Sequence, residues 1–163
     1  CKAMQESWRA MEAFYAAKKA RAIGVSNYCP SSFECILQTA TVVPTVNQIQ
    51  YHVGMGTDSE GLVSYCRSKN VTVQAYSPLG DGTKELITGP LVTKIGAAHN
   101  KTGAQVALHW LANQGIPLST KSTNEAHLRA NLDIFDWQLE VSETAELDAA
   151  TTPASTPSFM CRS

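Results

Sequence analysis

The sequence of 163 residues has few charged residues (17%), few aromatic residues (7%) and no excess of charge of either sign. Its 13 Lys and Arg residues stand against 14 Asp and Glu residues, which gives a formal net charge of −1. Proteins that neutralise rows of phosphate groups need a basic excess, so the composition argues against a nucleic-acid partner or an anionic membrane surface. No apolar run approaches the roughly 20 residues that a membrane-spanning helix requires.

The cysteines are few, widely spaced and odd in number: Cys1, Cys29, Cys35, Cys66 and Cys161. They form no C-x-x-C pair, and no histidine lies at zinc-finger spacing from them. Disulfide frameworks belong mainly to small secreted chains, and a structural zinc ion needs four ligands. The first residues also lack the apolar segment of a signal peptide. We therefore expect reduced thiols, no metal site and a cytoplasmic location.

Stretches rich in β-branched residues alternate with amphipathic stretches along the chain. The expected strands cover residues 22–26, 45–51, 71–76 and 116–121. The expected helices cover 6–19, 90–99, 103–113 and 124–132, with further helices beginning near 31, 57 and 142. S/T-x-x-E/Q patterns predict capping boxes at Ser31, Thr57 and Thr102, and Ser142 is expected to cap the last helix. Residues 77–89 are expected to form a loop and 153–163 an irregular tail.

Strands that alternate with helices imply right-handed crossovers and a parallel sheet, so we expect a single α/β domain over residues 1–163. Four strands are half of an eight-stranded (β/α)8 barrel of the TIM type, for which about 250 residues is typical. The pattern therefore predicts a partial (β/α)8 barrel of about four β/α units. An open, doubly wound sheet is the other arrangement that it permits.

Polar side chains follow the carboxyl ends of the expected strands, where ligands bind in both arrangements. They are Ser26 and Asn27, Gln48 and Gln50, Tyr76 and Ser77, and Lys121 and Ser122. Amides can pair with a carboxamide, a tyrosine ring can stack on a flat ring, and a lysine can meet a phosphate. No carboxylate pair or Cys/His dyad lies among them, and the chain has no G-x-G-x-x-G or P-loop motif. The set favours binding over bond breaking, although each residue alone also fits a role in a turn or in packing.

Several blocks of the chain resemble the aldo-keto reductases and occur in that family's order. They are residues 7–12, 19–28 with G-V-S-N, 46–52 with N-Q-I-Q-Y-H, 73–80 with A-Y-S-P-L-G, 101–110, and 121–122 followed by 131–136. The resemblance implies a (β/α)8 barrel that reduces aldehydes and ketones with NADPH. It also implies that this chain corresponds to strands five to eight of that barrel.

The resemblance assigns cofactor contacts to residues at matching positions: Ser26, Asn27, Gln48, Tyr76, Ser77, Leu79, Lys121, Ser122 and Asn131. By this resemblance the first three hold the nicotinamide carboxamide, and the Tyr76 ring stacks on the nicotinamide. Ser77 and Leu79 follow the pyrophosphate. Lys121 and Ser122 meet the adenosine 2′-phosphate, and Asn131 touches the adenine.

The chain also departs from the family pattern. The arginine that clamps the 2′-phosphate aligns with His127, whose imidazole is charged only at acidic pH, so we expect NADPH binding without a strong preference over NADH. Arg129 is the alternative anion partner if the register differs by two residues. The family's catalytic Asp, Tyr, Lys and His belong to strands one to four, and no segment here resembles that part. We assign no catalytic residue, neither Tyr51 with His52 nor Tyr76 with Lys121, and expect the chain alone to be inactive.

A half barrel leaves two strand edges and an interior face, which we expect to be apolar, open to water. Three situations would cover these surfaces. The chain is part of a longer enzyme that takes a small carbonyl substrate, or a second chain closes the barrel, or the chain is a catalytically silent interaction or scaffold subunit.

Overall fold

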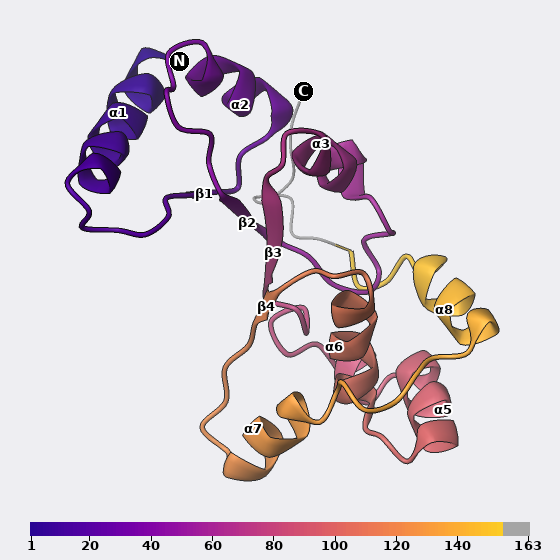
Figure 1. Ribbon diagram of the computed structural model, residues 1–163. Helices are drawn as coiled ribbons and strands as arrows, with labels where there is room; N and C mark the ends of the chain where they lie inside the picture. Colours follow the sequence, from indigo (N-terminus) through magenta and orange to yellow (C-terminus); the bar gives the residue numbers. More distant parts are fainter. Residues whose placement is uncertain (155–163) are drawn as a thin grey trace.

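The computed structural model describes residues 1–154, and its centre is a parallel four-stranded sheet (Figure 1). The strands are β1 (Val25–Ser26), β2 (Val46–Gln50), β3 (Thr72–Tyr76) and β4 (Leu118–Ser119), and they lie side by side in chain order. A doubly wound sheet reverses its strand order partway, whereas a barrel adds each strand beside the last. The sheet is therefore of the barrel type, and the predicted partial (β/α)8 barrel of four β/α units is confirmed.

One helix precedes the first strand, and the others connect the strands and follow the last one. They are α1 (Lys2–Ala16), α2 (Pro30–Leu37), α3 (Leu62–Ser68), α4 (Lys84–Ile87), α5 (Pro90–His99), α6 (Gly103–Asn113), α7 (Glu125–Leu132) and α8 (Val141–Asp148), with a 3-10 turn η1 (Ser59–Gly61) before α3. The bounds of α5 and α6 are those expected from the sequence. The loop expected over 77–89 instead contains the short helix α4, and most of the expected tail lies outside the described residues.

The expected strand over 116–121 is reduced to the two residues of β4. Pro117 has no N–H group to donate to a ladder, so the strand starts only after it. The Pro117 carbonyl still accepts the Ala75 N–H group at 2.8 Å. The other edge strand, β1, also has only two residues.

The capping box predicted at Thr102 is confirmed at the start of α6. The Thr102 hydroxyl accepts the Gln105 N–H group at 3.2 Å, and the Gln105 side chain accepts the Thr102 N–H group at 2.9 Å. The box at Ser31 is wrong, because Pro30 occupies the first turn of α2 and Ser31 already lies inside the helix. Pro at this position needs no N–H partner, which explains the earlier start.

Two further caps differ from the prediction. The Asp58 carboxylate, rather than the Thr57 hydroxyl, accepts the N–H groups of Val63 at 2.8 Å and Ser64 at 3.1 Å in the first turn of α3. The helix α8 begins after Glu140, which forms a capping box with Glu143, so Ser142 lies inside this helix. In both cases a carboxylate caps the helix in place of the expected hydroxyl, and its negative charge suits the positive end of the helix dipole.

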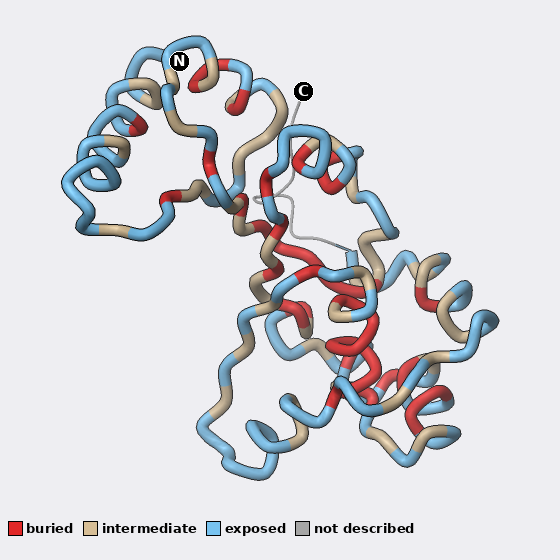
Figure 2. The backbone as a smooth tube through the Cα atoms, viewed as in Figure 1, coloured by how far each residue is buried: buried red, intermediate tan, exposed pale blue. Residues whose placement is uncertain are grey.

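The outer face of the sheet is apolar apart from the buried Asn47 and packs against the helices. Ile49, Val73 and Ala75 are at most 5% exposed and share one core with α2, α3, α5 and α6. Trp110 of α6 is 1% exposed in the same core and stacks at a tilt on Tyr51, with 5.6 Å between ring centroids. Figure 2 shows buried residues concentrated along the strands and α6.

The inner face of the sheet carries the alternate residues of the same strands, including Gln48, Gln50, Gln74 and Tyr76. Gln50 is 4% exposed, while Gln48, Gln74 and Tyr76 are half-buried. The expectation of an apolar interior face is therefore wrong at the centre of the sheet. The period-two alternation sends Ile49, Val73 and Ala75 outward to the helices and the three glutamines inward.

The helix α1 packs on a separate small core formed by Trp8, Ile23 and Ile36. The Trp8 indole N–H group donates to the Val42 carbonyl at 2.9 Å. The Glu12 carboxylate accepts the Val42 N–H group at 2.8 Å.

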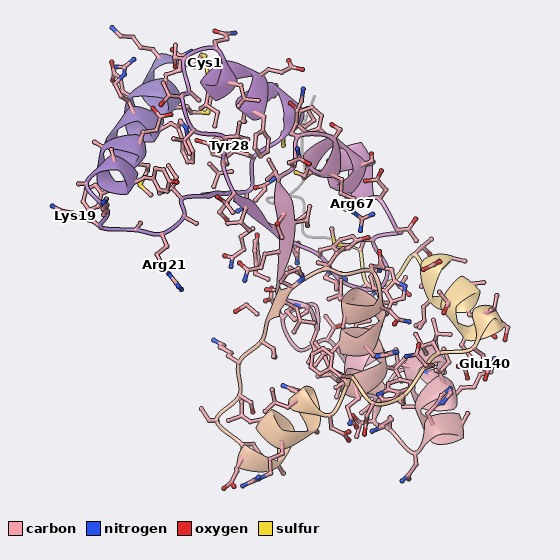
Figure 3. All side chains as sticks on the ribbon, in the orientation of Figure 1. Cys1, Lys19, Arg21, Tyr28, Arg67 and Glu140 are labelled. Carbon is pink, nitrogen blue, oxygen red and sulfur yellow. A yellow bond between two sulfur atoms is a disulfide. The ribbon has the colours of Figure 1, made fainter. Side chains whose placement is uncertain are left out.

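A disulfide joins Cys1 at the start of α1 to Cys35 of α2, whose Cα atoms are 5.5 Å apart (Figure 3). The expectation of reduced thiols is therefore wrong for this pair, because packing of α1 against α2 brings together two cysteines that lie 34 residues apart. Cys66 is a free, buried cysteine, and burial raises the pKa of its thiol. Across residues 1–154, no helix has both the length and the apolar character needed to cross a membrane.

Candidate functional site

The carboxyl ends of β1 and β3 turn sharply through residues with positive φ angles. Asn27 follows β1 with φ 57°, and Ser77 follows β3 with φ 47°. Such left-handed backbone is uncommon for residues other than glycine and tends to cluster at ligand sites. The Gln48 carbonyl accepts both the Asn27 N–H group and the Ser26 hydroxyl at 2.9 Å, which fixes the end of β1 against β2.

A side-chain hydrogen bond joins the ends of β1 and β3. The Tyr76 hydroxyl donates to the Asn27 Oδ1 atom at 3.1 Å. Burial raises the pKa of the Tyr76 hydroxyl, although the bond to Asn27 acts in the opposite direction. The Asn27 Nδ2 group has no hydrogen-bond partner within residues 1–154, so it is available to donate to a ligand.

A second side-chain hydrogen bond joins β2 and β3, one pair of residues further from the strand ends. Gln48 and Gln74 are register partners on β2 and β3, and the Gln48 Nε2 group donates to the Gln74 Oε1 atom at 2.9 Å. We did not predict Gln74 from the sequence. The alternation in Thr72–Tyr76 offers a signal for it, because Gln74 must share a face with Tyr76.

A cavity of about 690 Å³ lies at the carboxyl ends of β3 and β4. Six of the nine residues predicted to bind the cofactor line it: Tyr76, Ser77, Leu79, Lys121, Ser122 and Asn131. Ser26, Asn27 and Gln48 are not in its lining, but the bond from Tyr76 to Asn27 links them to it. Residues that are far apart in the sequence thus meet at the carboxyl ends of the strands.

The cavity brings together basic side chains and one carboxylate. Lys121 and His127 line it, and Lys121 is exposed and forms no ion pair within residues 1–154. Asp81 also lines it, and its carboxylate accepts a short hydrogen bond from the Ser77 hydroxyl. Arg129 is not in the lining; its guanidinium pairs with Glu125 at 2.7 Å, and its side chain is 78% exposed. His127, rather than Arg129, therefore lies beside Lys121 in the lining of this cavity.

The turn from β4 to α7 is ordered by its own polar side chains. The Ser122 hydroxyl accepts the Asn124 N–H group at 3.0 Å, and the Asn124 side chain accepts the Ala126 N–H group at 2.9 Å. On the other side of the cavity, the Asn131 amide contacts the Thr120 hydroxyl at 3.4 Å. The first two bonds order the backbone after Lys121, and the third joins α7 to the residue before it.

Tyr51 and His52 lie in the core rather than at the cavity. Tyr51 is fully buried, and its hydroxyl donates to the Gly56 carbonyl at 2.8 Å. Burial raises the pKa of Tyr51 and lowers the pKa of His52. His52 is 1% exposed, with its Nδ1 atom 2.7 Å from the Val53 carbonyl oxygen. The placement fits structural roles for both residues.

The donor set fits a nicotinamide dinucleotide on chemical grounds. Amides at Asn27 and Gln48 suit a carboxamide, the half-buried Tyr76 ring offers a stacking face, and the Lys121 ammonium in the cavity lining suits a phosphate. A cavity of this volume lies in the range of small-molecule sites, which measure about 300 to 1,000 Å³.

The model of the aldo/keto reductase family matches residues 2–152. The chain is 37% identical over 145 residues to glyoxal reductase of Bacillus subtilis, covering 89% of this chain and 51% of that protein. It is 37% identical over 145 residues to deoxymugineic acid synthase 1-B of Triticum aestivum, covering 86% of this chain and 46% of that protein.

Solved structures agree with this match. The aldose reductase of Schistosoma japonicum superposes with a TM-score of 0.82 and 32% identity, covering 90% of this chain and 47% of that one. An aldo-keto reductase complexed with NADPH gives a TM-score of 0.82 at 31% identity, covering 94% and 50%. The chain spans about half the length of the curated relatives it matches. With the barrel-type sheet and a family model that matches nearly all of its length, the chain belongs to the aldo/keto reductase family.

Proposed function

We propose that this chain is the cofactor-binding half of an NADPH-dependent carbonyl reductase and corresponds to strands five to eight of its barrel. The observation that carries the proposal is the shared cavity, where six of the predicted cofactor residues meet from β3, β4 and α7. The NADPH complex among the similar structures also supports a nicotinamide cofactor.

The side chains divide the work of binding. The cofactor, when bound, supplies the hydride. Ser26, Asn27 and Gln48 hold its carboxamide, and the Tyr76 ring lies against the nicotinamide. Ser77 and Leu79 follow the pyrophosphate, Lys121 and Ser122 bind the 2′-phosphate, and Asn131 contacts the adenine. His127 is a weaker partner for the 2′-phosphate than an arginine is, so NADPH is preferred over NADH only modestly.

The proton donor and most of the carbonyl-substrate pocket belong, in this proposal, to a second half that carries the catalytic Asp, Tyr, Lys and His. Tyr51, buried with its hydroxyl already donated to Gly56, is poorly placed to supply a proton. Tyr76, which donates its hydroxyl to Asn27, shares this difficulty. We therefore expect no oxidation of NADPH when the chain alone is mixed with a small aldehyde.

Titration of the chain with NADP⁺ in a calorimeter tests the proposal. Replacing Lys121 by Met removes the cation from the cavity, and we expect the dissociation constant for NADP⁺ to rise about tenfold, as for loss of one charge-assisted hydrogen bond. The matched control is Lys69→Met, because Lys69 lies between α3 and the amino end of β3 and does not line the cavity. Equal affinity of the wild type and Lys121→Met would remove Lys121 from the site, and no NADP⁺ binding by the wild type would refute the proposed function.

The second candidate is a catalytically silent interaction subunit, and one surface favours it. A groove of about 890 Å³ runs beside β4, lined in part by Leu118, Leu128, Leu132 and Phe135. Leu132 is 75% exposed and Phe135 is 72% exposed, and exposed apolar patches often mark contacts with other proteins. A chain that binds no dinucleotide but forms a stable assembly would favour this candidate over the enzyme half.

A further inference from the structure

A row of polar side chains crosses three strands of the sheet at one level. Ser26 of β1 is the register partner of Gln48 on β2, and Gln48 is the register partner of Gln74 on β3. The Gln48 Nε2 group donates to the Gln74 Oε1 atom at 2.9 Å, and both side chains are half-buried on the inner face. A contact of this kind fixes which way the Gln48 amide is turned.

The consequence for Gln48 follows from the asymmetry of an amide. Its nitrogen can only donate and its oxygen can only accept. With Nε2 turned toward Gln74, the Oε1 atom of Gln48, which has no hydrogen-bond partner within residues 1–154, is the group available to accept from a ligand.

Asn27 is held in the opposite sense. The Tyr76 hydroxyl occupies its Oδ1 atom at 3.1 Å, so Asn27 presents the donor group Nδ2. One acceptor from Gln48 and one donor from Asn27 together match a primary carboxamide, which has an NH₂ group and a carbonyl oxygen. A carboxylate has only acceptors, so one of its oxygens would face the Gln48 oxygen without a hydrogen bond.

We propose that Gln74 is a positioning residue that turns the Gln48 amide, and that with the Tyr76–Asn27 bond it makes this site selective for a carboxamide over a carboxylate. The inference rests on the proposed binding of a nicotinamide dinucleotide. It assigns no catalytic step to Gln74.

The experiment compares three ligands by calorimetry. They are NADP⁺, its nicotinic acid analogue, in which a carboxylate replaces the carboxamide, and adenosine 2′,5′-bisphosphate, which lacks the nicotinamide. We expect the wild type to prefer NADP⁺ over the carboxylate analogue by about tenfold or more, because a site built from fixed hydrogen-bonding groups rejects a mismatched ligand.

In Gln74→Met the Gln48 amide is free to turn, so we expect this preference to fall to about threefold or less. Affinity for adenosine 2′,5′-bisphosphate should not change.

Two further variants separate positioning from general damage. Gln74→Glu keeps an acceptor for the Gln48 Nε2 group and should retain the preference for NADP⁺. Tyr76→Phe frees the Asn27 amide and should reduce the preference, as Gln74→Met does, even if Gln74→Met folds poorly.

The outcomes distinguish the two proposals. Binding of all three ligands with no carboxamide preference in the wild type, or a wild-type preference in a folded Gln74→Met, would overturn the role of Gln74 and leave the cofactor site standing. Failure of the wild type to bind any of the three ligands would overturn the proposed function, and the role of Gln74 with it.

Discussion

The two faces of the sheet use the same strands for different purposes. On the outer face, Ile49, Val73 and Ala75 are at most 5% exposed and pack against helices. On the inner face, the alternate residues Gln48 and Gln74 are half-buried and hydrogen-bonded to each other. The outer face thus holds the chain together, and the inner face is left to present polar groups. A one-residue slip in register would exchange the two, so binding and stability depend on the same alignment of strands.

The largest expected effect lies in the helices that cover the outer face. Phe33 of α2 is fully buried and lies 5.8 Å, between ring centroids, from both Tyr28 and Tyr65. We expect Phe33→Ala to lower the free energy of unfolding by about 4 kcal/mol through lost burial and a cavity, as measured by urea denaturation followed by circular dichroism. The matched control is Phe14→Ala on α1, where the ring is 54% exposed and the loss should stay below about 1 kcal/mol. Similar losses for the two variants would contradict the comparison.

Two neighbours on β3 test the two faces directly. Val73 points outward and is 5% exposed. Thr72 lies on the inner face with Gln74 and is exposed. Val73→Ala should lower the free energy of unfolding by about 2 kcal/mol, the amount expected from losing part of a buried aliphatic side chain. Thr72→Ala should lower it by less than about 1 kcal/mol, the range of strand propensity. A larger loss at Thr72 than at Val73 would mean that the assignment of the faces is reversed.

The smallest expected effect concerns the start of α3, one of the helices on the outer face. Burial alone would raise the pKa of the Asp58 carboxyl, but hydrogen bonds from Ser64 and Val63 and the charge of Arg67 hold this pKa below its ordinary value. We expect Asp58→Ala to lower the free energy of unfolding by about 1 kcal/mol at neutral pH, the usual effect of losing a helix cap.

The lowered pKa also sets the sign of the pH dependence. The contribution of Asp58 is complete above the ordinary carboxyl pKa and is lost as pH falls through the lower value of the folded state. The difference in urea midpoint between the wild type and Asp58→Ala should therefore shrink between neutral pH and about pH 3. Thr57→Ala is the control, because the Thr57 hydroxyl caps nothing at this helix start. An equal loss in Thr57→Ala would restore the capping box predicted from the sequence.

Much of the fold follows from local patterns. The two periods of the hydrophobic residues predict the order of strands and helices, and the capping box at Thr102 fixes the start of α6. The prediction fails where a local rule competes with another. Pro117 delays β4, Pro30 moves the start of α2, and Asp58 caps α3 from outside the expected spacing.

The candidate site divides in the same way. Strand ends and family resemblance point to residues that meet at the cavity, such as Tyr76 and Lys121. The partner of Gln48 depends on the register of β2 against β3, and the Cys1–Cys35 disulfide depends on how α1 meets α2. Long-range pairings of this kind leave no local pattern, so only the folded chain reveals them.

The short edge strands, β1 and β4, limit how a further strand could pair with the sheet. β1 and β4 have two residues each, so an added strand would find very few main-chain hydrogen-bonding groups at either edge of the sheet. Such short borders discourage indiscriminate sheet-to-sheet association between copies. Leu118, Leu132 and Phe135 line a groove beside β4, so we expect apolar side-chain contacts, more than strand pairing, to hold any segment that packs there.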